Sequence, residues 1–222
     1  MLLSEAVWLK KNIEKYVSVD FAPVLNLGSS TLIFRTKINS CIDELVIKPI
    51  ERRTKSKVIH SDYKKDIGVD LCGDIYNKNF QNTIIEKKFK TIICTSLLEQ
   101  VEDPVKAISI IGSLVANHGL IFLTVPRRFP YHPDPIDIFF RPTQEELFSY
   151  FDQDKFILLE KELIADQSYF SFLLKRPKLL LNRIVRIFTP FYQFQSWKRQ
   201  MTYLPHYFKK LQQSCIIVRR IR

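Results

Sequence analysis

Short apolar runs alternate along this chain with longer segments whose apolar residues recur at helical spacing. Seven segments have the length of a strand, and they lie at residues 23–27, 58–62, 69–74, 92–94, 120–125, 156–164 and 214–218. The runs at 92–94 and 120–125 are apolar at nearly every position, which is typical of strands buried on both faces of a parallel sheet. Because strands and helices alternate throughout, the pattern predicts an α/β fold with a doubly wound, mostly parallel sheet.

The segments between these runs predict the helices. Residues 3–17 form an amphipathic pattern that places Val7, Ile13 and Val17 on the inner face. A helix is expected after residue 30, with one apolar face made by Phe34, Ile38, Ile42, Leu45 and Val46. The segment 51–57 is expected to be a basic connection to the next strand.

Two later helices carry start signals. Asp103 before Pro104 is typical of an N-cap carboxylate followed by a first-turn proline. Thr143 with Glu146 three residues on has the spacing of a capping box. We therefore expect helices to begin at both places.

Polar or small residues follow four of the predicted strands. Gly28-Ser29-Ser30 comes after the first, Asp62 ends the second, Asp74 ends the third, and Thr95 leaves the fourth. The carboxyl ends of parallel strands meet at one edge of an open sheet, where ligands bind. Each aspartate alone is more simply a solvated loop carboxylate or a helix cap, but the pair after a glycine turn favours a binding site. The turn lacks the G-x-G-x-x-G spacing that a dinucleotide pyrophosphate needs.

Motifs in the middle of the chain carry a family resemblance. Residues 98–104 read Leu-Glu-Gln-Val-Glu-Asp-Pro, and residues 118–126 read His-Gly-Leu-Ile-Phe-Leu-Thr-Val-Pro. With His-Pro-Asp-Pro-Ile-Asp at 132–137 and Arg-Pro-Thr at 141–143, this order resembles the class I S-adenosylmethionine-dependent methyltransferases. The resemblance covers roughly residues 20 to 165 and the last strand. It implies a seven-stranded Rossmann-like methyltransferase fold, S-adenosylmethionine as cofactor, and methyl transfer to a small-molecule, glycan or lipid-linked acceptor.

The resemblance also implies roles for individual residues. Asp62 would accept the ribose hydroxyls, Asp74 and Ile75 would contact the adenine, and Thr95 would face the methionine and the methyl group. The turn around the amino-acid end of the cofactor would be built by Asn26, Gly28 and Ser30. Four positions depart from the family pattern, namely Asn26, Ser30, Lys90 and Gln100. These departures leave open an alternative, a catalytically silent methyltransferase-like binding or scaffold module.

The loop after the fifth predicted strand holds the candidate catalytic groups. His132 is the candidate general base, Asp137 or Asp134 would orient it, and Arg141 would clamp the acceptor. The alternative is a structural loop, since three prolines stiffen residues 130–135. The other histidines have no partners at ligand spacing, so no metal site is expected.

Composition bounds the size and compartment of the protein. With 222 residues and 46% apolar content, the chain can bury one sizeable core, and a single domain over 1–222 is expected. No apolar run has the length of a membrane span, and no charged leader opens the chain. The four cysteines lack metal spacing and are expected to be buried free thiols in a reducing compartment. These features predict a cytoplasmic protein.

Positive charge is concentrated at the end of the chain. Residues 167–222 contain twelve of the 34 Lys and Arg residues and none of the 23 acidic ones, so the remainder carries 22 basic against 23 acidic residues. Roughly fifty residues separate the last two strands, too many for a hairpin turn, so 167–212 is predicted to be a basic, aromatic helical insertion. Within it, 172–208 is typical of a surface that contacts anionic membrane peripherally. The alternative is a helix that packs its apolar face on the sheet and leaves a basic face in solvent, and nucleic acid binding is the least favoured.

Overall fold

The computed structural model describes residues 1–17, 19–131 and 137–222, and its centre is a seven-stranded sheet of order β3-β2-β1-β4-β5-β7-β6. The strands are β1 Val24–Leu27, β2 Ile59–Asp62, β3 Leu71–Cys72, β4 Thr91–Thr95, β5 Leu120–Arg128, β6 Phe156–Ser168 and β7 Lys210–Arg220. The pairs from β3 to β5 are parallel, and β7 is antiparallel to both β5 and β6. The doubly wound, mostly parallel sheet predicted from the sequence is confirmed.

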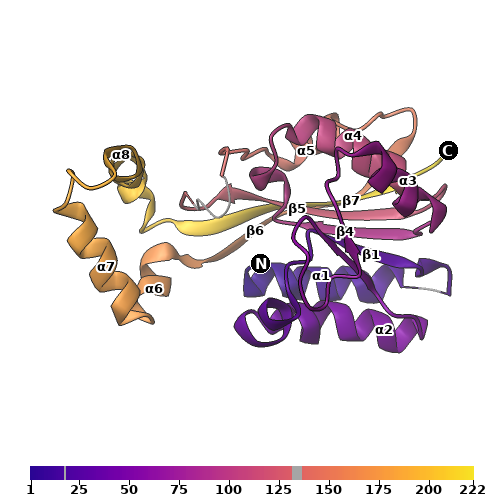
Figure 1. Ribbon diagram of the computed structural model, residues 1–222, viewed down its shortest axis with the longest axis horizontal. Coiled ribbons are helices and arrows are strands. Elements are labelled where there is room, and N and C mark those ends of the chain that lie inside the picture. Colours follow the sequence, from indigo (N-terminus) through magenta and orange to yellow (C-terminus); the bar gives the residue numbers. More distant parts are fainter. Residues whose placement is uncertain (18, 132–136) are drawn as a thin grey trace.

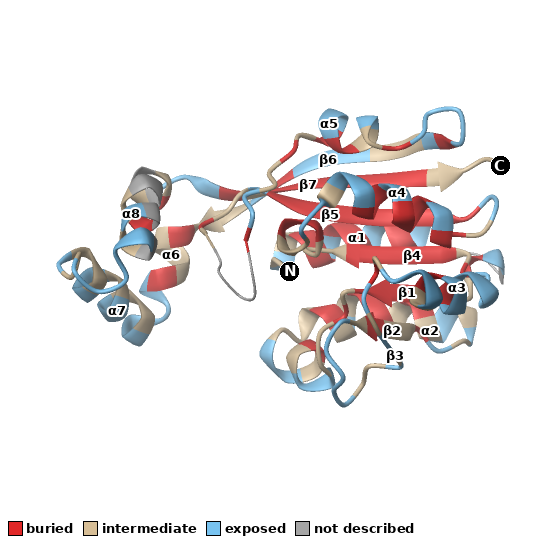
Figure 2. Ribbon diagram, turned by 45° about the horizontal axis from the view of Figure 1, so that its top comes forward, coloured by how far each residue is buried: buried red, intermediate tan, exposed pale blue. Residues whose placement is uncertain are grey.

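Helices cover both faces of this sheet (Figure 1). One layer contains α1 Leu3–Tyr16 and α2 Lys48–Thr54, and the other contains α3 Lys78–Glu86, α4 Pro104–Leu114 and α5 Gln144–Ser149. The protein has a hydrophobic core on each face of the sheet. Neighbouring residues of the central strands pack alternately in these two cores, with Ile92 in one and Ile93 in the other. Burial on both faces explains the continuous apolar runs, and Figure 2 shows these strands as the buried centre of the fold.

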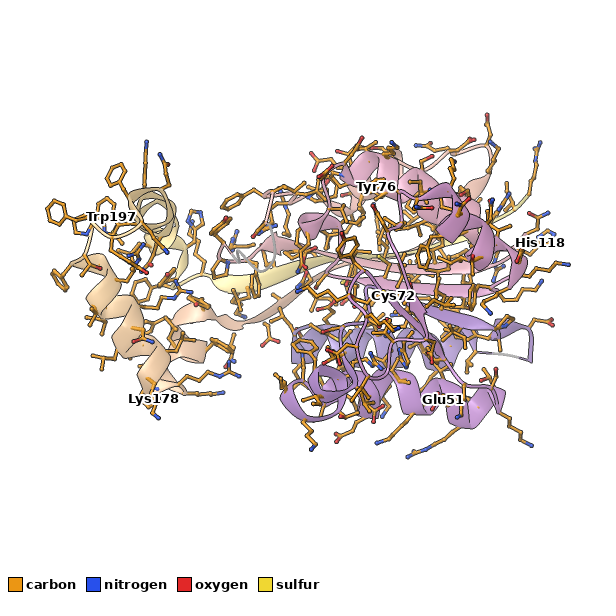
Figure 3. The ribbon with its side chains drawn as sticks, viewed as in Figure 1. Glu51, Cys72, Tyr76, His118, Lys178 and Trp197 are labelled. Atoms are coloured by element: carbon orange, nitrogen blue, oxygen red, sulfur yellow. The ribbon has the colours of Figure 1, made fainter. Side chains whose placement is uncertain are left out.

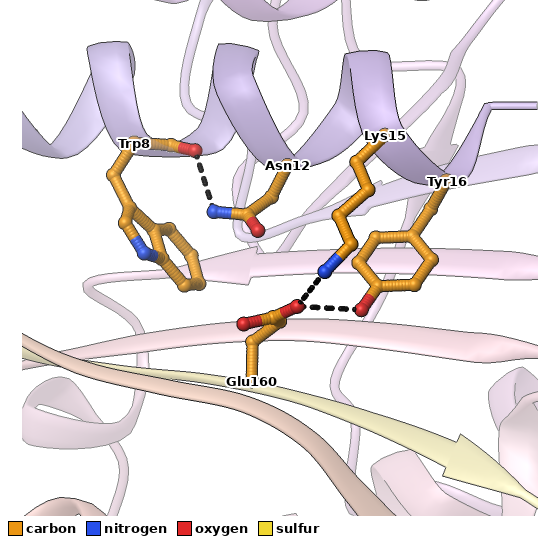
Figure 4. Close-up of polar contacts among 5 residues, drawn as sticks. All are labelled: Trp8, Asn12, Lys15, Tyr16 and Glu160. Atoms are coloured by element: carbon orange, nitrogen blue, oxygen red, sulfur yellow. Dashed lines mark hydrogen bonds and ion pairs between the residues drawn. The ribbon is translucent and has the colours of Figure 1, made fainter.

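The first helix packs on the sheet through a face that differs partly from the predicted one. Ile13 is buried as expected, but Val7 is exposed, so its inward placement was wrong. The buried positions are Glu5, Ala6, Trp8, Leu9, Asn12 and Ile13. The C-terminal end of the helix is tied to β6, because Lys15 pairs with Glu160 and Tyr16 Oη donates to the same carboxylate at 2.8 Å (Figure 4).

The segment after β1 is not one regular α-helix. It consists of two π-helical turns, Phe34–Ile38 and Asp43–Ile47, followed by α2. Asn39 leaves the helical conformation between the two turns, with φ −132° and ψ 62°. This break rotates the apolar face, so that Ile38 is 70% exposed while Ile42 and Val46 are buried. The predicted basic connection 51–57 is partly helical, because α2 continues to Thr54.

Both predicted helix starts are confirmed. Asp103 Oδ1 accepts a hydrogen bond from Lys106 N at 2.9 Å at the start of α4. Thr143 and Glu146 exchange side-chain and backbone bonds at the start of α5. Local capping chemistry therefore determined these boundaries, as the sequence indicated.

Strands β6 and β7 extend beyond the rest of the sheet and carry three helices between them. These are α6 Tyr169–Leu174, α7 Pro177–Ile187 and α8 Phe194–Tyr203, and together they project away from the sheet (Figure 1). We call residues 169–209 the arm. A small core joins Tyr169, Leu173 and Tyr207 of the arm to Leu211 of β7. Within the described residues, no helix is both long enough and apolar enough to cross a membrane.

Candidate functional site

Three of the predicted cofactor residues lie in one row across neighbouring strands. Leu27 pairs with Ser61 of β2 and with Cys94 of β4, so the next residues along, Gly28, Asp62 and Thr95, are side by side at the carboxyl edge. Adjacent strands are about 4.8 Å apart, so Asp62 and Thr95 flank the glycine turn closely. This is the edge at which open α/β sheets bind ligands.

The turn after β1 uses two left-handed residues. Gly28 has φ 72° and Ser30 has φ 57°. The backbone amides of Gly28 and Ser29 both donate to Ser61 O at 2.9 Å, and Ser30 N donates to Asp62 Oδ2 at 2.7 Å. Left-handed backbone costs a non-glycine residue roughly 1–2 kcal/mol. The charge-assisted bond to Asp62 offsets that cost, so serine is accommodated at a position where the family pattern that the sequence resembles has glycine.

A side chain at Gly28 would be crowded by Leu97 and strained by the left-handed backbone. A Cβ there would lie 3.1 Å from Leu97 Cδ1 and 3.2 Å from Leu97 Cβ. Leu97 lies two residues after the end of β4 and is half-buried. It therefore forms an apolar wall beside the turn, and the close approach explains why glycine is needed at 28.

A buried arginine that the sequence analysis did not identify holds the turn in place. Arg35 is 2% exposed. Its Nη1 donates to Ser29 O at 3.2 Å and to Ser30 O at 2.5 Å, and its Nη2 donates to Gly68 O at 2.7 Å. Burial lowers the pKa of the Arg35 guanidinium, while the charges of Asp70, Asp43 and Asp62 raise it. Arg35 thus joins the β1 turn to the loop between β2 and β3.

Asn26, where the family pattern has an acid, is directed toward a histidine. Its Nδ2 lies 3.2 Å from His60 Nδ1. Burial, and then the positive charge of Arg35, lower the pKa of His60 to about 4. The imidazole is therefore neutral at pH 7 and accepts from the amide. Asn26 acts in this structure as a link between β1 and β2.

The predicted adenine contacts lie at the rim of the same edge. Gly73 N donates to Asp62 O at 3.1 Å, which sets the backbone around Asp74 beside β2. Ile75 is buried in the core under α3 and α4, whereas Asp74 is exposed and accepts from Tyr76 N at 2.9 Å. Tyr76, labelled in Figure 3, donates its hydroxyl to Asp103 O at 2.8 Å. The strand tip is thereby attached to the start of α4.

The predicted catalytic loop is described in part. His132 and Asp134 lie outside the described residues. Asp137 and Arg141 form a buried ion pair, with Nη2 and Oδ2 2.6 Å apart, and Arg141 Nη1 donates to Phe140 O at 3.1 Å. The segment is attached to the corner after β4, because Ile138 N donates to Glu99 O at 3.0 Å.

Glu99 is a second group that the sequence analysis did not select. Burial raises the pKa of this carboxyl from an ordinary 4.5 to about 7, with the charge of Arg141 opposing the shift and that of Asp137 adding to it. Among the described residues, its Oε2 has no hydrogen-bond partner. The sequence offered one signal for the burial of Glu99, namely its place at the centre of a Leu-Glu-Gln corner beside an apolar strand. In the part of the chain that the structure covers, no three His, Cys, Asp or Glu side chains gather as a metal site would require.

Solved structures with the same architecture identify the fold. Coclaurine N-methyltransferase, solved with N-methylheliamine and S-adenosylhomocysteine, matches 97% of this chain and 72% of its own at 13% identity, with a TM-score of 0.57. A proposed sarcosine dimethylglycine methyltransferase from Galdieria sulphuraria matches 96% of this chain and 83% of its own at 12% identity, with a TM-score of 0.51. The fold is that of class I S-adenosylmethionine-dependent methyltransferases.

This methyltransferase fold does not by itself determine the reaction. The [4+2]-cyclase SpnF also matches 96% of this chain and 79% of its own at 12% identity, with a TM-score of 0.55. No protein-family model matches the sequence, and no curated protein matches it either. The function must therefore be argued from the residues at the edge of the sheet.

Proposed function

We propose that this protein transfers a methyl group from S-adenosylmethionine to a small-molecule, glycan or lipid-linked acceptor. The observation that carries the proposal is the row of Gly28, Asp62 and Thr95 at the carboxyl edge of a methyltransferase-type sheet. The cofactor supplies an electrophilic methyl group on a sulfonium. The chain holds the cofactor and presents the acceptor to it.

The residues of the edge fit such a cofactor. A carboxylate has about four acceptor positions, and Asp62 uses two of them, for Ser30 N and Lys64 N, which leaves capacity for ribose hydroxyls. Leu97, half-buried beside the turn, would supply apolar surface for a purine ring, and Ile75 would contact the ring from the rim of the core. Thr95 would face the methyl group, and Asn26, Gly28 and Ser30 would surround the amino-acid end. At the acceptor side, His132 is the proposed base, with Asp137 and Arg141 as the pair that positions the loop.

Replacing Asp62 by alanine is expected to weaken S-adenosylhomocysteine binding at least tenfold, because hydrogen bonds to a charged acceptor contribute about 1.5–3 kcal/mol. Calorimetric titration measures the affinity. Asp154→Ala is the matched control, since Asp154 is an exposed loop aspartate next to the start of β6, at the opposite edge of the sheet. Equal affinities of the Asp62 variant and the wild type would contradict the proposal, as would the absence of binding by a folded wild type.

A catalytically silent binding module is the second candidate. Asn26 favours it, because a neutral amide engaged with His60 replaces the acid of the family pattern. The two candidates differ in turnover. Transfer of labelled methyl groups from the cofactor into a cell extract supports the enzyme, whereas tight cofactor binding without transfer supports the silent module.

We also propose that the arm contacts anionic membrane surfaces. Helix α7 has no buried residue, although it carries apolar side chains along one face. Phe191 is 98% exposed and Phe188 78% exposed. The arm has no carboxylate to balance its lysines and arginines. Exposed aromatics beside positive charge complement the headgroup layer of an anionic bilayer. Figure 3 shows Lys178 and Trp197 on two different helices of the arm, α7 and α8.

Substituting Phe188 and Phe191 together by serine is expected to weaken sedimentation with phosphatidylserine-containing vesicles about tenfold, because two insertable rings are removed. The control substitutes Ile38 and Ile67 by serine, two similarly exposed apolar residues on the sheet domain. Binding by the wild type should fall as salt rises. Equal sedimentation of both variants, or a preference of the arm for single-stranded oligonucleotide over vesicles, would count against membrane contact.

A further inference from the structure

A basic cavity lies where the arm joins the sheet. It has a volume of about 270 Å³ and is lined by Arg127, Arg128, Phe139, Arg141, His206 and Gln212. Its residues come from four parts of the chain: the end of β5, the segment after it, the base of the arm, and the start of β7. None of the cofactor-row residues belongs to this lining, so the cavity is a separate feature of the same edge.

A β-bulge allows two consecutive arginines to face this cavity. Along the β5–β7 pair, Pro126 is opposite Gln213 and Arg128 is opposite Gln212, so Arg127 is an extra residue on β5. In a regular strand, neighbouring side chains point to opposite faces of the sheet. Bulges re-aim side chains and are common beside functional sites. Here the bulge brings both guanidinium groups to one hollow.

The arginines that line this cavity differ in whether a carboxylate pairs with them. Arg141 is paired with Asp137, but among the described residues no carboxylate forms an ion pair with Arg127 or Arg128. Arg127 Nη1 donates to Arg141 O at 2.5 Å, which fixes the direction of its side chain. The hydrogen bond from Thr143 N lowers the pKa of Glu146, and the positive charge of the nearby Arg127 lowers it further. Two guanidinium groups thus face an open volume, and their N–H donors are available to a ligand.

The position of the cavity fits the acceptor rather than the cofactor. Thr124 of β5 is paired with Thr95, and Arg127 and Arg128 follow three and four residues later in the same direction. At about 3.3 Å per residue, they lie roughly 10–13 Å beyond the point expected for methyl transfer. The volume is also smaller than the roughly 300–1,000 Å³ of whole-ligand pockets, so it holds one end of a ligand.

We infer that the Arg127–Arg128 cavity binds a phosphate or pyrophosphate group of the acceptor, one to two sugar-ring lengths from the atom that is methylated. This inference rests on the proposed function, because it names the class of acceptor that the proposed methyltransferase would use. Guanidinium pairs match the planar, multidentate recognition that phosphoryl oxygens require. A diphosphate-linked glycan, on a lipid or on a nucleotide, has this chemistry.

Titration with inorganic pyrophosphate tests the cavity directly. The wild type should bind, and the double variant Arg127→Gln/Arg128→Gln should bind at least tenfold more weakly. Arg52→Gln/Arg53→Gln is the matched control, because it removes the same charge from an adjacent, exposed arginine pair on α2. Equal binding by the two double variants, or no binding by the folded wild type, would overturn the inference.

The same variants separate this inference from the proposed function. Arg127→Gln/Arg128→Gln should keep wild-type affinity for S-adenosylhomocysteine and a wild-type unfolding midpoint, since neither arginine touches the cofactor row. Pyrophosphate binding without cofactor binding would support the phosphate site and contradict the proposed methyltransferase activity. Cofactor binding without pyrophosphate binding would support the methyltransferase proposal and contradict the phosphate site. Competition by geranyl pyrophosphate in phosphatidylcholine vesicles indicates a lipid-linked source of the phosphate. Competition by uridine diphosphate glucose indicates a soluble one, and either supports the site.

Discussion

Replacing Arg35 by methionine is expected to destabilise the protein by about 3 kcal/mol or more and to abolish cofactor binding. The guanidinium donates to the carbonyl oxygens of Ser29, Ser30 and Gly68, and methionine can donate to none of them. A buried acceptor left without a partner costs about 1–3 kcal/mol. Urea unfolding followed by circular dichroism measures the loss.

Two further variants make the Arg35 result interpretable. Arg53→Met removes an exposed arginine from α2 and should change stability by less than about 0.5 kcal/mol. Arg35→Lys keeps the charge but cannot reach Ser30 O and Gly68 O together, so it should recover only part of the stability. A loss below 1 kcal/mol for Arg35→Met would show that the turn holds its shape without this side chain.

The edge of the sheet could be predicted because its determinants are local. Val24 to Leu27 is a short, mainly apolar run followed by a glycine, and Asp62 ends the next strand, so the local sequence alone places Gly28 and Asp62 at strand ends. Parallel pairing then brings them together, as the neighbouring positions of Leu27 and Ser61 demonstrate. Caps such as Thr143 with Glu146 were predictable for the same reason, since both partners lie within one turn.

The residues that the sequence analysis missed depend on contacts between distant segments. Arg35 donates a hydrogen bond to Gly68, and Ile138 donates one to Glu99. The partners are far apart in the sequence, so the local pattern of apolar and polar residues does not indicate these contacts. In the sequence, Arg35 is one basic residue in a helical stretch, and its burial follows only from the loop that closes over it. Ile38 was misplaced because the break at Asn39 changes the helical period, which an α-helical pattern cannot anticipate.

The arm and the basic cavity are adjacent, so membrane contact by one would affect the position of the other. Strands β6 and β7 carry the arm away from the carboxyl edge of the sheet, and His206 of the arm and Gln212 of β7 help to line the cavity. A membrane-bound arm would therefore hold the cavity close to the headgroup layer. An acceptor whose diphosphate lies at that depth would meet Arg127 and Arg128 before its glycan reached Thr95.

Replacing Glu99 by glutamine is expected to remove a pH dependence of about 3 kcal/mol from the free energy of unfolding. The folded pKa of about 7 lies above the ordinary 4.5, so between these values the folded protein holds a proton that the unfolded chain has released. Stability from this group is therefore greatest below pH 4.5, falls as the pH rises to 7, and is constant above. A shift of this size corresponds to about 3 kcal/mol.

Urea unfolding of the wild type and the Glu99→Gln variant at pH 5 and pH 8 measures this effect. The variant should be close to the wild type at pH 5 and more stable by up to about 3 kcal/mol at pH 8, because it never buries a charge at this position. His60 titrates in the opposite sense, with stability lost as the pH falls from 6.5 toward 4, but it is common to both proteins and cancels in their difference. Glu102→Gln, an exposed change in the same corner, should leave the pH profile of the wild type intact. If Glu99→Gln and the wild type differ equally at both pH values, the buried carboxyl is ionised throughout and its surroundings are more polar than the corner after β4 indicates.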